Sequence, residues 1–227
     1  MLIVALDPPT GLDAFKWIST RLRLLEGIVS GFKIGLPALL RLGIDRVREI
    51  VKTYSSKDLL LIADLKLADV GFVMKLSAEV ISYAGFNAII AHSFIGVEGA
   101  LEVLAQRCRE LGLRLITVVS MTHPAASKMF DPILEQLINI AKEVGSWGIV
   151  VPATRPNVIR RARQLVGSEI KILAPGVGAQ GATPGEAICS GADYEIVGRS
   201  ITYSEDPYRA ALQILSEQRE RVARCRG

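Results

Sequence analysis

The chain has 227 residues, of which 50% are hydrophobic, and a formal net charge of +4. A chain of this length buries a sizeable core, and we expect a single domain over residues 1–227. The sequence contains no run of about 18 uninterrupted apolar residues, and its apolar start lacks a basic leader. We therefore expect neither a membrane span nor a signal peptide.

The positive charge is compatible with a small anionic substrate but does not indicate nucleic-acid binding. Basic residues concentrate at 160–163 and 219–226, where no aromatic side chains are interleaved with them. Such runs are most simply solvated helix faces, and no recognised nucleic-acid-binding module accompanies them. We therefore expect no nucleic-acid partner.

The cysteines carry information about the compartment. Cys108, Cys189 and Cys225 are odd in number, far apart and free of C-x-x-C spacing. This pattern argues against a disulfide framework and against a zinc site. A reducing cytoplasm fits it best, so we expect a cytoplasmic protein.

Short runs rich in β-forming residues alternate with longer segments of helical period along the whole chain. The predicted strands cover residues 2–6, 28–34, 59–65, 88–92, 113–119, 148–151, 170–173 and 194–197. The predicted helices cover residues 12–25, 39–52, 73–83, 97–111, 132–144, 157–165, 183–190 and 206–224. Strict alternation indicates a parallel sheet, and eight units in this length favour an α/β fold of the closed (β/α)₈ TIM-barrel type over an open sheet.

Reacting groups in such a barrel collect where the strands end. Polar or turn-forming residues stand at most of these places: Asp7, Lys33, Asp64, Lys66, His92, Thr122, Pro175, Gly176, Gly198 and Arg199. Single residues also have structural interpretations, since Asp7 could open a helix and Lys33 could snorkel. His92 and His123 receive no catalytic role, because a histidine there is more often a hydrogen-bonded structural residue or part of a turn.

The run Asp64-Leu65-Lys66-Leu67-Ala68-Asp69 places a lysine between two carboxylates after an apolar strand. On a strand, Asp64 and Lys66 point to the same face. Burying both ions costs several kcal/mol before pairing recovers it, so the run indicates chemistry, the alternative being a structural ion-pair network. The carboxylates keep Lys66 protonated, which suits it as an acid and argues against a Schiff-base nucleophile.

Two glycine-bearing segments point to an anion. Residues 174–181 follow the seventh strand and residues 197–200 follow the eighth, and glycine lets backbone N–H groups approach a phosphate closely. Barrels of this fold often bind phosphate at those two loops, where Arg199 can add a bidentate contact. The sequence therefore predicts a phosphate site at the loops after the seventh and eighth strands.

Taken together, these segments resemble the orotidine 5′-phosphate decarboxylase family, whose signature is D-x-K-x-x-D. The resemblance spans nearly the whole chain. It is carried by Ala5-Leu6-Asp7, Phe32-Lys33-Ile34-Gly35, Asp64-Leu65-Lys66-Leu67-Ala68-Asp69, Met121-Thr122-His123-Pro124, Pro175-Gly176-Val177-Gly178-Ala179-Gln180-Gly181 and Val197-Gly198-Arg199-Ser200-Ile201. In that order and spacing the segments are together highly specific for this family.

The resemblance implies decarboxylation of orotidine 5′-phosphate to UMP, the last step of pyrimidine nucleotide synthesis, without cofactor or metal. It implies that Lys66 protonates C6 of the pyrimidine while Asp64 lies against the departing carboxylate. Asp69 would serve the neighbouring subunit's site in a homodimer.

The resemblance also implies the binding roles. Residues matching Asp7 and Lys33 hold ribose hydroxyls, and Thr122 stands where a serine or threonine reads the base. The predicted substrate contacts after strands seven and eight are Pro175, Gln180, Gly198 and Arg199, the last three gripping the phosphate and residues 176–181 forming a lid.

One departure from the family pattern follows the charged run. Many members carry a threonine at the position of Val73, which cannot donate a hydrogen bond to the partner's ribose. The array is shared with magnesium-dependent relatives that decarboxylate 3-keto-gulonate 6-phosphate or make hexulose 6-phosphate, and this is the main catalytic alternative. A catalytically silent barrel that binds a phosphorylated metabolite is the alternative of a different class.

Overall fold

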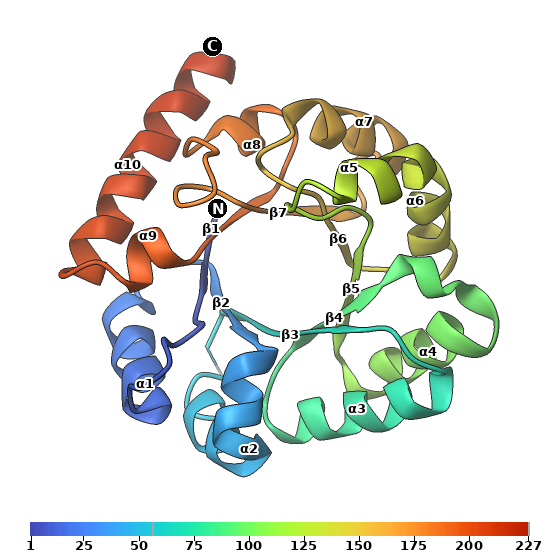
Figure 1. The fold of residues 1–227 in the computed structure, drawn as a ribbon, viewed down its shortest axis with the longest axis horizontal. Helices are drawn as coiled ribbons and strands as arrows, with labels where there is room; N and C mark the ends of the chain where they lie inside the picture. The colour runs from blue at the N-terminus through green and yellow to red at the C-terminus, as the bar shows by residue number, and fades with distance from the viewer. Residues whose placement is uncertain (56, 227) are drawn as a thin grey trace.

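Eight parallel strands form a closed barrel in the computed structural model, which describes residues 1–55 and 57–226. Each strand pairs with the next, and β1 also pairs with β8, which closes the ring (Figure 1). The predicted (β/α)₈ barrel is therefore confirmed. The strands are β1 (Leu2–Ala5), β2 (Gly31–Gly35), β3 (Leu60–Leu67), β4 (Ala88–His92), β5 (Arg114–Val118), β6 (Gly148–Val150), β7 (Lys171–Pro175) and β8 (Tyr194–Val197).

Helices surround the barrel as an outer layer (Figure 1). None of the described helices is both long and apolar enough to cross a membrane. The helices are α1 (Ala14–Leu25), α2 (Leu36–Val51), α3 (Gly71–Tyr83), α4 (Glu102–Leu111), α5 (Ala126–Met129), α6 (Leu134–Glu143), α7 (Pro156–Val166), α8 (Glu186–Cys189), α9 (Arg199–Thr202) and α10 (Pro207–Arg226).

Three predicted helices differ from the observed ones in how they begin or by several residues in length, and glycine or proline explains each. The helix expected at 97–111 begins with a π turn (Val97–Leu101) containing a left-handed Gly99, and only then continues as α4. The helix expected at 132–144 begins as a 3₁₀ turn (Asp131–Ile133) around its proline. The helix expected at 183–190 shrinks to α8, because Gly185 before it has a left-handed φ of 85°.

The two faces of the strands build two apolar layers. The outer face packs against the helices in the larger hydrophobic cluster. The inner face fills the barrel with a second cluster that includes Ile62, Ile90, Val118, Val150 and Ile196. Four of these also line a cavity at the carboxyl ends of the strands, so the filled barrel is the floor of that cavity.

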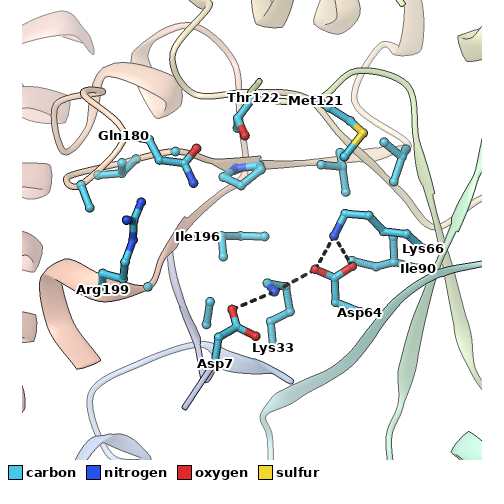
Figure 2. Close-up of a pocket in the computed structure, with 18 of the residues that line it drawn as sticks. Asp7, Lys33, Asp64, Lys66, Ile90, Met121, Thr122, Gln180, Ile196 and Arg199 are labelled. Atoms are coloured by element: carbon cyan, nitrogen blue, oxygen red, sulfur yellow. Dashed lines mark hydrogen bonds and ion pairs between the residues drawn. The ribbon is translucent and has the colours of Figure 1, made fainter. Parts of the chain in front are cut away.

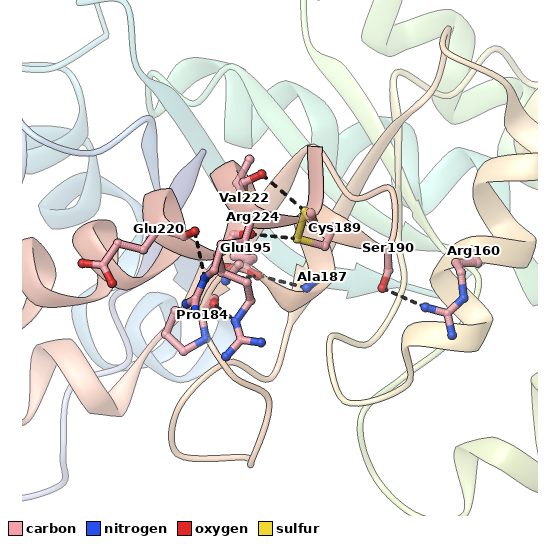
Figure 3. The surroundings of a disulfide bond; sticks show 12 residues. Arg160, Pro184, Ala187, Cys189, Ser190, Glu195, Glu220, Val222 and Arg224 are labelled. Atoms are coloured by element: carbon pink, nitrogen blue, oxygen red, sulfur yellow. Dashed lines mark hydrogen bonds between the residues drawn. A yellow bond between two sulfur atoms is a disulfide. The ribbon is translucent and has the colours of Figure 1, made fainter. Parts of the chain in front are cut away.

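A disulfide between Cys189 and Cys225 joins α8 to α10, with the two Cα atoms 6.0 Å apart (Figure 3). The expectation drawn from cysteine spacing was therefore wrong. The two residues are 36 positions apart, and only the closing of the barrel brings α8 against α10, so spacing alone carries no signal for this bridge. The cysteines consequently give no support for a reducing compartment.

Candidate active site

A cavity of about 370 Å³ opens at the carboxyl ends of the strands (Figure 2). It brings together nine of the ten residues predicted for the site. They are Asp7, Lys33, Asp64, Lys66, Thr122, Pro175, Gln180, Gly198 and Arg199. The tenth, Asp69, does not line it.

Strand β3 carries the central ion pair. The Lys66 ammonium lies 2.7 and 2.8 Å from the two carboxylate oxygens of Asp64, whose side chain is 6% exposed. The contact does not arise from regular strand alternation, because Lys66 has a left-handed φ of 47° and the pairing with β4 shifts register between Ala63 and Leu67. Such a backbone is strained for lysine, and strain of this kind concentrates at functional sites.

Strand β2 extends the pair into an alternating row of charges. The Lys33 ammonium lies 2.8 Å from Asp64 Oδ2 and 3.7 Å from Asp7 Oδ2. We name these four residues, Asp7, Lys33, Asp64 and Lys66, the charged row (Figure 2). Gly35 makes the row possible, since a Cβ there would lie 2.4 Å from Asp7 Oδ1.

The charged row sets its own protonation states. Burial alone would lower the pKa of Lys33, but the carboxylates of Asp64 and Asp7 outweigh burial and raise it. Burial alone would raise the pKa of Asp64, but Lys33 and Lys66 outweigh burial and lower it. The buried members of the row are therefore held in their charged forms at neutral pH.

The opposite side of the cavity is built from a turn, residues 176–185, which we name the glycine loop. Its backbone folds on itself, since the N–H of Gly178 donates to the Ala182 carbonyl at 2.8 Å. The N–H of Ala179 donates to Ser200 Oγ at 2.8 Å, and a Cβ at Gly178 would lie 2.3 Å from that oxygen. The loop is thereby held close to α9.

Gln180 and Arg199 project into the cavity from these two elements (Figure 2). Arg199 is the first residue of α9, directly after Gly198. In the described part of the chain, the Arg199 guanidinium has no carboxylate within 4.0 Å. An uncompensated guanidinium beside an amide and a glycine-rich backbone is suited to bind a phosphate.

The segment after β5 carries Thr122 and is fixed from outside the cavity. Arg155, just before α7, donates hydrogen bonds to the Met121 carbonyl and to Ser120 Oγ, and its guanidinium pairs with Asp131. Sequence reasoning missed this arginine. Its only signal is a charged residue shortly after the sixth strand, which on its own predicts a solvated side chain.

Within the described residues, neither Asp69 nor His92 makes a hydrogen bond or ion pair with the charged row. Asp69 Oδ1 accepts the N–H of Val70 at 2.7 Å. His92 is buried against the Phe94 ring, with centroids 4.7 Å apart. The pKa of His92 is lowered to about 4. Burial is the largest cause, the charge of Lys66 also lowers the pKa, and the charge of Asp64 opposes this by a smaller amount. The imidazole is therefore neutral at pH 7.

Tyr203 also lines the cavity, although no pattern in the sequence singles it out. Its hydroxyl donates to the Asp7 carbonyl at 3.1 Å, and its ring lies edge-on to Trp17. It thereby joins the end of α9 to the charged row. Among the described residues, no group of three or more His, Cys, Asp or Glu side chains is arranged to hold a metal ion.

The geometry places an ammonium beside a carboxylate at one end of the cavity and a guanidinium beside a glycine-rich turn at the other. Comparison with known proteins identifies the family. The model of the "Orotidine 5′-phosphate decarboxylase / HUMPS family" matches residues 1–214. An orotidine 5′-phosphate decarboxylase of Aeropyrum pernix is 46% identical over 210 residues, covering 92% of this chain and 84% of the relative.

Further relatives cover almost the full length of both chains. One from Saccharolobus solfataricus, with the same name, is 36% identical over 226 residues, covering 100% of this chain and 95% of the relative. The crystal structure of the Sulfolobus solfataricus enzyme has a TM-score of 0.85 at 36% identity, covering 97% of this chain and 98% of that one. The Methanocaldococcus jannaschii enzyme, complexed with the inhibitor BMP, has a TM-score of 0.84 at 30% identity, covering 96% of this chain and 97% of that one. The chain therefore belongs to the orotidine 5′-phosphate decarboxylase / HUMPS family.

Proposed function

We propose that this chain, as a single domain over residues 1–227, decarboxylates orotidine 5′-phosphate to UMP and carbon dioxide. The observation that carries this proposal is the charged row facing Gln180 and Arg199 across one cavity. The names of its full-length relatives support the same reaction. The product places the enzyme at the last step of pyrimidine nucleotide synthesis.

The chemical step is assigned to Lys66. The bond between C6 and the carboxylate carbon breaks, its electron pair stays on C6, and a proton from the Lys66 ammonium forms the new C6–H bond. The electron pair lies in the ring plane, outside the π system, so the site must stabilise it electrostatically. One charge contact at about 4 Å and an effective dielectric near 20 is worth on the order of 4 kcal/mol.

Asp64 acts on the substrate carboxylate that departs in this step. It holds the Lys66 ammonium at 2.7 Å and stands where the substrate carboxylate would depart. Two carboxylates at close range repel each other, and the repulsion is relieved when carbon dioxide leaves. Lys33 holds Asp64 in place from the side away from Lys66, so the charged row is preorganised before substrate binds.

The remaining contacts bind parts of the substrate that do not react. Gln180, Gly198 and Arg199 would hold the phosphate, and Thr122 with Pro175 would line the base. Binding energy gained at the phosphate can be used to close the glycine loop and to hold C6 against Lys66. The large rate enhancement of such a reaction needs this remote contribution, because one ammonium contact is too small.

The ribose hydroxyls would be held by Asp7 and Lys33 and by Asp69 of a second subunit. The surface beside Asp69 supports a homodimer. Helices α2 and α3 leave an apolar groove of about 370 Å³, where Leu40 is 76% and Leu76 45% exposed. Exposed apolar grooves of this kind mark association surfaces. Val73 lines the same groove and replaces the hydroxyl that many relatives offer the ribose.

Complementation tests the shared site. Lys66→Ala and Asp69→Ala proteins, each inactive alone, are mixed under conditions of verified subunit exchange. Mixed dimers contain one site with both residues intact, so partial activity returns. Continued inactivity after exchange contradicts the role given to Asp69. The dimer itself is measured by analytical ultracentrifugation.

The reaction is tested by the loss of orotidine 5′-phosphate absorbance with purified protein, with excess EDTA, and with Lys66→Ala. We expect turnover that survives chelation and disappears in the variant, since we propose no metal and no cofactor. Tight UMP binding without turnover would indicate a silent nucleotide-binding barrel. If the protein shows no turnover and does not bind UMP, the result would favour the magnesium-dependent sugar-phosphate relatives.

We further propose that the protein works in the cytoplasm, without a nucleic-acid or membrane partner. The Cys189–Cys225 bridge does not support this location, because disulfides are rare in most cytosolic proteins. Cell fractionation with antibodies to the protein tests the location.

A further inference from the structure

A buried carboxylate lies behind the glycine loop, outside the catalytic cavity. Glu195 is 0% exposed and sits in β8 between Tyr194 and Ile196, both of which belong to the inner cluster. Its own side chain therefore points the other way, toward the helices. Burying a carboxylate there is strongly unfavourable unless strong hydrogen bonds compensate.

The compensation comes from N–H donors at the end of the glycine loop. The N–H of Gly185 donates to both Glu195 oxygens at 2.9 Å, and the N–H of Ala187 donates at 3.2 Å. The Gln218 side-chain amide of α10 adds a donor at 2.9 Å. No lysine or arginine in the described ranges lies within 4.0 Å of the carboxylate, so its partners are all neutral.

Helix α10 closes over the same point. Arg221 Nε donates to the Pro184 carbonyl at 3.0 Å. A Cβ at Gly185 would lie 2.9 Å from Arg221 Cβ and 3.0 Å from the Gln218 carbonyl oxygen, so α10 touches the loop backbone itself. The end of the glycine loop is held between β8 and α10. Figure 3 shows Glu195 and Pro184 beside the helix.

Gly185 fixes the chain just after the tip of the glycine loop, residues 176–182. The tip is a closed unit, because backbone hydrogen bonds through Gly178 and Ala182 join its two sides. Gln180 is carried on that unit, while Arg199 is carried by α9, which follows β8 directly. Glu195 thus connects the two elements that present the phosphate donors.

We propose that Glu195, together with Gln218 and Arg221, positions the glycine loop for the phosphate of the substrate. We name these three residues the loop clamp. Two of them lie beyond residue 214, where the match to the family model ends. The clamp acts through the loop and touches no reacting atom, so its members are positioning residues. This inference rests on the proposed function.

Glu195→Gln is the main test. An amide in this place turns an N–H₂ group toward the donors of Gly185 or Gln218, which breaks the clamp with almost no change in volume. Misplacement of a binding group by about 1 Å can cost on the order of 100-fold in rate. We expect kcat/KM for orotidine 5′-phosphate to fall about 10- to 100-fold, mainly through KM.

The phosphate-free nucleoside orotidine separates positioning from general damage. It makes no use of the phosphate donors, so its slow turnover stays within about twofold of wild type in Glu195→Gln. Calorimetry gives the parallel readout, with weaker UMP binding and unchanged uridine binding. Glu217→Gln is the matched control, since it makes the same change on an exposed side chain of α10 whose one hydrogen bond among the described residues is from Gln213.

Equal losses for ligands with and without phosphate, or no loss at all, would overturn the proposal. Where Glu195→Gln does not fold, Arg221→Gln and Gln218→Leu replace it, because each removes one clamp hydrogen bond from the helix side. A wild-type chain that fails to turn over the substrate contradicts the proposed function instead. The ratio of UMP to uridine affinity then still decides whether the clamp positions a phosphate site.

Discussion

The two ends of the cavity are built in different ways. At the β1–β3 end, side chains on strands hold one another through ion pairs, and Asp64 is buried between two ammonium groups. At the β7–β8 end, the proposed phosphate donors stand on a turn and on the short helix α9, and no ion pair within the described residues fixes Arg199. We therefore expect the reacting end to be rigid by itself and the proposed phosphate end to depend on supports outside the cavity.

The largest expected effect is at the reacting end. Lys66→Ala removes the proposed proton donor and the ammonium that we expect to face the developing charge. A positioned acid contributes about 10²- to 10⁴-fold and the charge contact a further 10³-fold, so we expect kcat to fall at least 10⁴-fold. UMP affinity, measured by calorimetry, stays within about tenfold. A similar loss in kcat and in UMP affinity would contradict a role confined to the chemical step.

A smaller effect is expected at the phosphate end. Arg199→Ala removes a charged, bidentate partner worth about 3 to 4 kcal/mol, which corresponds to about 10²- to 10³-fold in kcat/KM. Turnover of phosphate-free orotidine is unaffected, because the lost contact involves only the phosphate. Comparing the two substrates tests this directly, and a loss shared by both would place Arg199 in the chemistry.

The disulfide supports the phosphate end from outside. Cys225→Ser opens a covalent loop closed over 36 residues, and the chain-entropy estimate for a loop of that length is about 4 kcal/mol. We expect the free energy of unfolding, from urea titration of oxidised protein, to fall by about 2 to 4 kcal/mol. At urea concentrations well below the unfolding midpoint, the activity of the variant stays within about twofold of wild type, because the loop clamp remains. Reductant lowers the free energy of unfolding of the wild type to that of the variant and leaves the variant unchanged.

The smallest effect concerns His92, next to the reacting end. Its pKa is lowered from 6.5 to about 4 in the fold, so between these values the unfolded chain binds a proton that the folded chain does not. Stability therefore falls as pH falls, by about 2 kcal/mol between pH 8 and pH 5. His92→Asn lacks this contribution, so its stability changes less over the same range. Parallel pH dependences in wild type and variant would show that His92 titrates normally.

The sequence predicted the barrel and most of the cavity because both follow from local patterns. Alternating strands and helices indicate a barrel, and a barrel brings the residues after each strand to one face. Asp64, Lys66 and Arg199 could be placed in this way. The left-handed backbone of Lys66 could not, because lysine rarely adopts that conformation and no neighbouring residue signals it.

The rest of the site depends on contacts between distant segments. The Asp7 side chain leaves no room for a Cβ at Gly35, and Ser200 accepts a hydrogen bond from the glycine loop. In the sequence, however, each of these residues alone predicts only a turn. Glu195 interrupts an otherwise apolar strand, which is a visible signal of a buried polar network. Its partner Gln218 lies 23 positions away, and only the folded chain identifies it.

The backbone of Lys66 has a consequence for the evolution of this enzyme. At φ 47° glycine or asparagine is preferred over other residues, and a non-glycine residue there costs about 1 kcal/mol or more. Selection for stability alone would therefore favour replacing Lys66, to which we assign the proton transfer. Under that assignment selection for turnover retains the lysine, and a family member without it would have changed its activity without changing its fold.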